Sequence, residues 1–259
     1  MLPTPLSLRL DPSRPIREQI REAARLGARG VVIDAVGDIA PSRLSETGRR
    51  ELRHLLRSVE LNLVALNLPT RRPFDSPDQL DDRLNRAETA FTLAYELGTN
   101  LVLARVGGLP AESAALPRET FVGAVRELGG RADHRGVRLA VETGPDSGDS
   151  LRALLDGLAS PGLAASLDPA ALLQHNHNPV AAAVSLGAWL AHAYATDPTS
   201  SSVVSLARRG GLPAGGLDWL EYLGALEEAN YRGYLTIWPD PSREPGPQFT
   251  TIADSLKRL

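Results

Sequence analysis

Short runs of β-branched and apolar residues alternate along this chain with longer segments whose apolar residues recur every three or four positions. The first pattern is typical of buried strands and the second of amphipathic helices. The predicted strands cover residues 6–10, 31–36, 61–67, 100–106, 137–142, 163–168, 191–197 and 234–240. Helices are predicted to start around Pro15, Pro41 and Pro77, and then to cover 118–134, 149–159, 179–187, 218–229 and 250–258. The stretches after Asp168 and Asp197 are expected to be mostly loop.

This alternation predicts an α/β fold, because strands separated by helices pair in parallel through right-handed crossovers. About eight strand–helix units in 259 residues match a single (β/α)₈ TIM barrel, which typically takes ~250 residues. We therefore expect one domain over residues 1–259. The alternative is an open doubly wound sheet, but no Gly-x-Gly-x-x-Gly motif follows the first predicted strand.

Composition narrows the classes of function. The formal net charge of −3 gives no overall attraction to nucleic acid or to anionic membranes, so neither is expected as a partner. The absence of cysteine excludes thiolate catalysis and cysteine-ligated metals, and the only lysine, Lys257, is poorly placed for Schiff-base chemistry. The N-terminus lacks the basic start and long apolar stretch of a signal peptide, so a soluble cytoplasmic protein is expected.

The candidate site lies where the predicted strands end, because the carboxyl ends of barrel strands face the active site of such folds. Strand alternation places Glu142 and Asp168 on inward faces. Buried carboxylates are costly unless they are paired, hydrogen-bonded or bound to metal. Two interpretations remain open: the pair binds a metal or a substrate, or an arginine such as Arg105 neutralises it.

Further residues would surround the same mouth. Asp34 and Asn67 end the second and third predicted strands, and Tyr194 and Trp238 lie on the last two. The two aromatic side chains could stack on a sugar ring, or they could fill a vacated metal site. His192 shares the face of Tyr194 one layer deeper and is expected to be a hydrogen-bonded core histidine.

Two loops carry weaker signals. Arg71 and Arg72 follow the third predicted strand and could bind a phosphate or a carboxylate, with Phe74 capping a pocket. His175 and His177 follow Asp168 and could swing over the mouth. For both loops, the alternative is a solvated segment without function.

The order of elements and four short phrases resemble the xylose isomerase-like TIM barrels, a group that includes sugar isomerases, sugar epimerases and endonuclease IV. The phrases are residues 26–31 (LGARGV), 95–98 (YELG), 140–142 (AVE) and 231–234 (YRGY). The resemblance spans nearly the whole chain. It implies a divalent metal held by Glu, Asp, His and Glu side chains on the last strands.

Only half of that implied ligand set is present, so the resemblance implies a degenerate metal site. Glu142 matches the first ligand and Asp168 the second. The seventh-strand His-x-x-Asp becomes a segment that starts at Tyr194 and keeps Asp197, and Trp238 replaces the last glutamate. In epimerases of the group both glutamates also move the proton, so a two-base mechanism lacks one base here.

Two hypotheses follow. In the first, the protein is a sugar or sugar-phosphate isomerase or epimerase that uses Mn, Mg, Zn or Co. Glu142 is then ligand or base and Asp168 is a ligand, and His175, His177 or Asp240 completes the metal shell. The residues expected to bind the substrate are Asp34, Asn67, Arg71, Arg72, Arg105, Tyr194 and Trp238. In the second, it is a metal-free or non-catalytic barrel that binds a small carbohydrate-like ligand or a protein partner. The sequence leaves catalytic activity and oligomeric state open.

Overall fold

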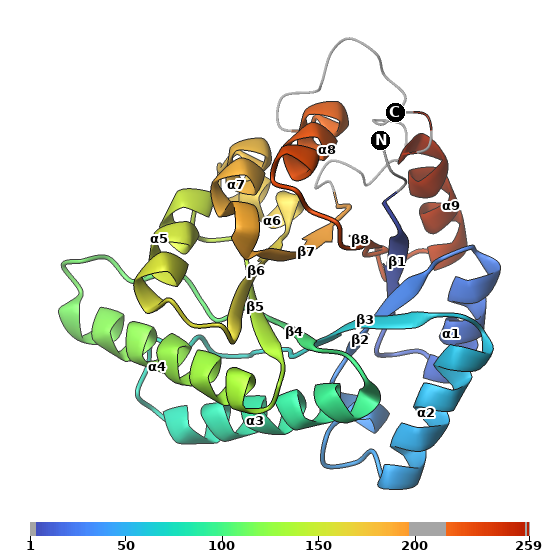
Figure 1. The fold of residues 1–259 in the computed structure, drawn as a ribbon, viewed down its shortest axis with the longest axis horizontal. Helices are drawn as coiled ribbons and strands as arrows, with labels where there is room; N and C mark the ends of the chain where they lie inside the picture. Colours follow the sequence, from blue (N-terminus) through green and yellow to red (C-terminus); the bar gives the residue numbers. More distant parts are fainter. Residues whose placement is uncertain (1–3, 197–215, 257, 259) are drawn as a thin grey trace.

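Eight parallel strands close into a barrel, with each strand paired to the next and β8 paired back to β1 (Figure 1). The computed structural model describes residues 4–196, 216–256 and 258. The strands are β1 (Leu6–Arg9), β2 (Gly30–Asp34), β3 (Asn62–Asn67), β4 (Leu101–Ala104), β5 (Arg138–Glu142), β6 (Leu163–Leu167), β7 (Leu190–Tyr194) and β8 (Leu235–Ile237). The closed order confirms the predicted (β/α)₈ barrel.

Helices surround this barrel on the outside (Figure 1). They are α1 (Ile16–Arg25), α2 (Glu46–Ser58), α3 (Leu80–Leu97), α4 (Ala115–His134), α5 (Gly148–Leu158), α6 (Pro169–Gln174), α7 (Pro179–Leu186), α8 (Trp219–Glu228) and α9 (Pro245–Leu256), with short 3₁₀ turns η1 (Gly37–Ile39) and η2 (Gly187–Trp189). Within the described residues, no helix is both long and apolar enough to cross a lipid bilayer.

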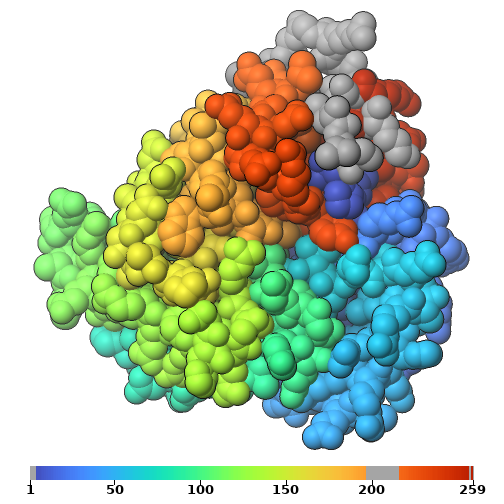
Figure 2. Space-filling model, viewed as in Figure 1, coloured from blue at the N-terminus to red at the C-terminus, as the bar shows by residue number. Residues whose placement is uncertain are grey.

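Strand alternation separates two sets of core side chains. On β5, Leu139 and Val141 belong to the large apolar cluster between strands and helices, whereas Ala140 belongs to a smaller cluster inside the barrel. The inner cluster consists of Val32, Ala65, Leu101, Leu103, Ala140, Ala164 and Tyr194. In the space-filling view side chains occupy the middle of the molecule (Figure 2). Glu142 shares the inward face of Ala140, as the alternation predicts.

The sequence-based boundaries are wrong at two places near the mouth. Residues after Asp168 form the helix α6, because the Asp168 side chain accepts a hydrogen bond from Ala171 N and Pro169 occupies the first helical turn. Strand β8 ends at Ile237, well before the predicted Asp240. Pro239 lacks the N–H that a continuing strand would need. The predicted loop after Asp197 lies outside the described residues.

Candidate functional site

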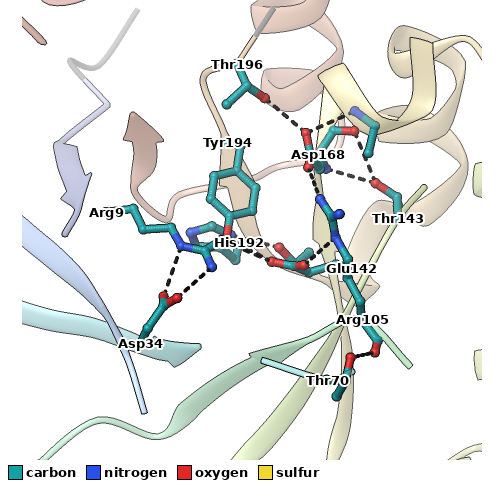
Figure 3. A network of polar contacts seen from close by, with 12 residues as sticks. Arg9, Asp34, Thr70, Arg105, Glu142, Thr143, Asp168, His192, Tyr194 and Thr196 are labelled. Atoms are coloured by element: carbon teal, nitrogen blue, oxygen red, sulfur yellow. Dashed lines mark hydrogen bonds and ion pairs between the residues drawn. The ribbon is translucent and has the colours of Figure 1, made fainter. Parts of the chain in front are cut away.

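Arg105 joins the two carboxylates that end neighbouring strands. Glu142 is the last residue of β5 and Asp168 directly follows β6, while Arg105 directly follows β4. The Arg105 Nε donates to Glu142 Oε2 at 3.1 Å, and Nη2 donates to Asp168 Oδ2 at 3.1 Å (Figure 3). The carboxylate side chains are 3% and 4% exposed, whereas the Arg105 side chain is 55% exposed. The guanidinium of one half-exposed side chain is therefore paired with two buried acids, which is the arrangement that the second interpretation of the sequence describes.

A second arginine approaches Glu142 from the other side of the barrel through Tyr194. The Tyr194 hydroxyl donates to Glu142 Oε1 at 2.8 Å and accepts from Arg9 Nη1 at 3.0 Å. Arg9 also donates twice to Asp34, at 3.1 and 3.2 Å. Figure 3 shows these side chains converging from β1, β2, β5 and β7. Tyr194 is fully buried, so it is a structural part of this network.

Burial dominates the proton affinities in this network. Removal from water raises the pKa of Glu142, and the neighbouring Asp168 adds to this effect, while Arg9 and Arg105 oppose it. Burial and the adjacent Glu142 carboxylate raise the pKa of Tyr194 well above 10. Tyr194 therefore stays neutral and acts as a hydrogen-bond donor to Glu142.

The Asp168 carboxylate is already occupied by donors from its own chain. Its Oδ1 accepts from Ala171 N at 3.2 Å and from Thr196 Oγ1 at 3.0 Å. Its Oδ2 accepts from Arg105, and its backbone N–H donates to Thr143 Oγ1 at 2.8 Å. Asp168 thus caps α6 and anchors Arg105 at the same time.

Trp238 lies over Arg9 and keeps part of its ring in solvent. The Arg9 guanidinium carbon is 3.7 Å from the centre of the indole, a cation–π geometry. The Tyr194 ring lies 5.9 Å from the Trp238 ring at an interplanar angle of 35°. Because Trp238 is 39% exposed, part of its aromatic surface faces solvent beside Arg9 and Tyr194.

One layer deeper, His192 is a core residue, as the sequence predicts. Its Nδ1 is 2.9 Å from Ser166 Oγ and its Nε2 is 2.6 Å from Thr236 Oγ1, which in turn lies 2.6 Å from Ser7 Oγ. Burial lowers the pKa of His192 to about 3, with a further contribution from Arg9. The imidazole is therefore neutral at physiological pH and serves as a hydrogen-bonded support for the mouth.

The other predicted metal ligands make hydrogen bonds to groups outside the mouth. His175 Nδ1 contacts the carbonyl oxygen of Ala171 at 2.8 Å, and His177 Nε2 contacts that of Pro145 at 3.1 Å. Asp240 accepts from Ser242 N and Oγ, at 2.9 and 2.7 Å. Over residues 4–196, 216–256 and 258, no group of three or more His, Asp or Glu side chains is arranged to hold a metal ion. The metal shell expected from these residues is thus not assembled in that part of the chain, and Asp197 lies outside it.

The donor set at the mouth also does not fit a divalent cation. The Arg105 guanidinium lies between Glu142 and Asp168, where a cation shared by both would have to sit. The Tyr194 hydroxyl is held between Arg9 and Glu142, and the indole of Trp238 has no atom that ligates metals. Hard cations require several oxygen ligands. Among the described residues, the carboxylate oxygens of Glu142 and Asp168 already accept hydrogen bonds from protein donors.

The remaining predicted site residues divide between the mouth and its rim. Asn67 is buried at the end of β3 beside Asp34. Arg72 is paired with Asp78 at 2.8 Å, whereas Arg71 is exposed. Phe74 is 2% exposed and belongs to the core, so it forms part of the wall of the pocket beside Arg71 and Arg72 and does not cap it.

Sequence reasoning missed Arg9. The available signal was the run Leu-Ser-Leu-Arg-Leu at residues 6–10, in which Ser7 and Arg9 share the inward face of an otherwise apolar strand. An arginine on the inner face of a barrel strand must find acidic partners.

Comparisons with known proteins agree with this geometry at the level of the fold. A family model described as xylose isomerase-like TIM barrel matches residues 20–259. No curated protein matches the sequence. A xylose isomerase domain protein from Planctomyces limnophilus superposes with a TM-score of 0.79 at 18% identity, covering 99% of this chain and 95% of that one.

Two sugar epimerases are also similar in structure. The 3-keto-D-glucoside 4-epimerase of E. coli has a TM-score of 0.76 at 14% identity, covering 98% of this chain and 99% of that one. The D-psicose 3-epimerase of Clostridium cellulolyticum H10, solved with D-tagatose, has a TM-score of 0.71 at 18% identity, covering 96% and 85%. Identities this low establish the shared fold, and the activity has to be argued from the site.

Proposed function

Because the chain belongs to the xylose isomerase-like TIM barrel family, we propose that the carboxyl-end mouth of its barrel binds a small carbohydrate-like ligand, with Arg105 in the place of a divalent cation. The observation that carries this proposal is the single guanidinium that bridges Glu142 and Asp168 while more than half of its side chain remains exposed. A permanent positive charge is thereby held at the mouth, facing solvent.

The exposed groups around Arg105 suit a polyhydroxylated ligand. Arginine carries five N–H donors, and the Nη1 of Arg105 makes no hydrogen bond within the described residues, so it can donate to a carbonyl or hydroxyl oxygen. Trp238 offers an aromatic face for the C–H side of a sugar ring. Asp34 lies close by, is not fully buried and can accept from hydroxyl groups. Solved structures of relatives with D-tagatose and D-allulose support a carbohydrate as the ligand class.

Replacement of Trp238 by alanine should weaken binding of such a ligand about tenfold, or ~1.4 kcal/mol, because the stacking surface is lost. The measurement is a screen of monosaccharides and sugar acids by ligand-observed NMR in the presence of EDTA, followed by Kd determination for each hit. The matched control is Trp189→Ala, because Trp189 lies in η2 just before β7, at the end of that strand away from the mouth. If no carbohydrate binds the parent protein, or if the Trp238 variant binds as tightly as the parent, the proposal is wrong.

A second candidate function is isomerisation of the bound sugar, favoured by the raised pKa of Glu142. A carboxylate with a raised proton affinity is a better base.

Glu142 would take the proton from the carbon beside the carbonyl, and the C–H electron pair would form the enediolate double bond while Arg105 stabilises the oxyanion. Glu142 would return the proton to the former carbonyl carbon, and a hydroxyl proton would pass between the two oxygens. With Trp238 in place of a second carboxylate, a one-base isomerisation fits better than a two-base epimerisation. Solvent deuterium uptake into the ligand, followed by NMR, would detect this reaction, and its absence for every ligand that binds would exclude it.

A further inference from the structure

A pocket of about 350 Å³ lies between the loop that follows β3 and the start of α3. Its lining includes four arginines: Arg71, Arg72, Arg83 and Arg86. The side chain of Phe74 is part of the wall and belongs to the core. We call this space the arginine pocket.

The four arginines differ in how they are held. Arg72 is paired with Asp78, and Arg83 donates to the carbonyl oxygens of Ser76 and Asp78, which fixes its guanidinium in the wall. The side chains of Arg71 and Arg86 make no hydrogen bond or ion pair within the described residues. Two positive charges in the wall are thus uncommitted.

Little negative charge opposes them. Asp82 is the acidic side chain that lines the pocket, and it lies in the first turn of α3. The same turn has no side-chain cap at Gln79, so its free N–H groups add positive potential. The balance of charge around the pocket remains positive.

The arginine pocket is physically joined to the mouth. The Thr70 hydroxyl, which lines the pocket, donates to the carbonyl oxygen of Arg105 (Figure 3). The backbone N–H of Phe74 donates to Val106 O at 2.9 Å, so the loop is hydrogen-bonded to the segment after β4 at both Arg105 and Val106. The wall of the pocket and the backbone that carries Arg105 are therefore neighbours.

We propose that the arginine pocket binds an oxyanion, a phosphate or a carboxylate, carried by the ligand of the mouth. This inference rests on the proposed function, and it defines the ligand as an anionic carbohydrate. Guanidinium groups recognise both oxyanions through paired N–H donors, and Arg71 and Arg86 are free to provide them. The pair lies on two different elements, the β3–α3 loop and α3, so an anion between them would be held from two sides.

The test uses NMR chemical-shift titration of the whole chain with sodium phosphate and, separately, with sodium acetate at constant ionic strength. The double variant Arg71→Gln/Arg86→Gln should bind the preferred anion at least tenfold more weakly than the parent. The matched control is Arg232→Gln, an exposed arginine before β8 whose side chain has no hydrogen bond or ion pair within the described residues. A preference for phosphate would indicate a phosphorylated sugar, and a preference for acetate would indicate a sugar acid.

Equal binding in the parent and the double variant, or no binding of either anion by the parent, would overturn the arginine pocket as an anion site. The Trp238→Ala variant should bind inorganic anions as the parent does, because Trp238 lies outside the pocket. A parent protein that binds anions but no carbohydrate would count against the mouth, and a parent that binds carbohydrates but no anion would count against the arginine pocket alone.

Discussion

Arg105→Met should lower the free energy of unfolding by about 2–3 kcal/mol at pH 7, because Glu142 and Asp168 would lose the cation that they share. Removal of one partner from a fully buried ion pair typically costs about 3–5 kcal/mol. The Arg105 side chain is 55% exposed, so water can replace part of the interaction and the expected loss is smaller. The measurement is urea denaturation followed by circular dichroism. The matched control is Arg17→Met, whose ion pair with Glu51 is more than half exposed on both sides and should contribute less than about 1 kcal/mol.

The cost of losing Arg105 should also depend on pH. Burial already raises the pKa of Glu142, and Arg105 opposes that rise, so the pKa should be higher still in the variant. When the pKa of a glutamate is higher in the folded protein than in the unfolded chain, the folded state is destabilised at pH values where the same glutamate would be ionised in the unfolded chain. For glutamate this range begins above about pH 4.3. The difference from the parent should therefore grow from pH 4 to pH 7. A variant as stable as the Arg17 control at pH 7 would show that Arg105 is not the principal counter-ion of the carboxylates.

Glu142→Gln should abolish solvent deuterium uptake into any ligand that the parent isomerises, which is the largest effect expected on activity. The amide keeps the shape of the side chain and can still bond to Tyr194 and Arg105 after reorientation, but it cannot accept a proton from carbon. Loss of a general base alone commonly costs about 10²–10⁴ in rate. Here no second carboxylate lies on β8 to take over, because Trp238 occupies that place.

The ligand affinity separates a chemical role for Glu142 from a structural one. The Kd for the ligand in the Gln variant should stay within about threefold of the parent, because Arg105 and Trp238 remain in place. Glu127→Gln, on the exposed surface of α4, is the control for an unrelated carboxylate. If the Glu142 variant turns over the ligand at the parent rate, Glu142 is not the base.

The barrel could be predicted because its signal is local. The alternation of β-branched runs with helical periodicity lies in short windows of sequence, and parallel strands with helical connections have few arrangements. The inward orientation of Glu142 and Asp168 follows from the two-residue period of a strand. Their burial and need for a counter-charge could also be foreseen, and an arginine such as Arg105 was one of the two partners that the sequence left open.

The parts that could not be predicted depend on contacts between distant segments. Arg9 reaches Tyr194 across 185 residues of sequence, and no local pattern reveals that pairing. The expected metal shell is not assembled among the described residues, where His175 bonds to a carbonyl four residues earlier and His177 to one in the loop after β5. Neither contact is evident from the loop sequence. The helix α6 was missed because Asp168 was considered only as a ligand, although Asp followed by Pro is a strong signal for the start of a helix.

The family resemblance and the site geometry lead to different chemistry at the same strand ends. The resemblance implies a metal at Glu142 and Asp168, whereas the structure puts a guanidinium between them. Arginine supplies one positive charge and fixed donors, so it can polarise a ligand oxygen, although less strongly than a divalent ion. An exchange of metal for arginine would retain the carboxylates as its anchor, which accounts for the presence of Glu142 and Asp168 without their usual partners.

Calorimetric titration of the metal-stripped protein with Mn²⁺ tests this exchange most directly, with Glu142→Ala as the control. We expect no saturable binding up to about 1 mM Mn²⁺, because Arg105 already neutralises both carboxylates and too few oxygen ligands remain. Micromolar or tighter binding that disappears in the Glu142 variant would contradict the role of Arg105 as a built-in cation and would restore a metal-dependent isomerase or epimerase as the leading function.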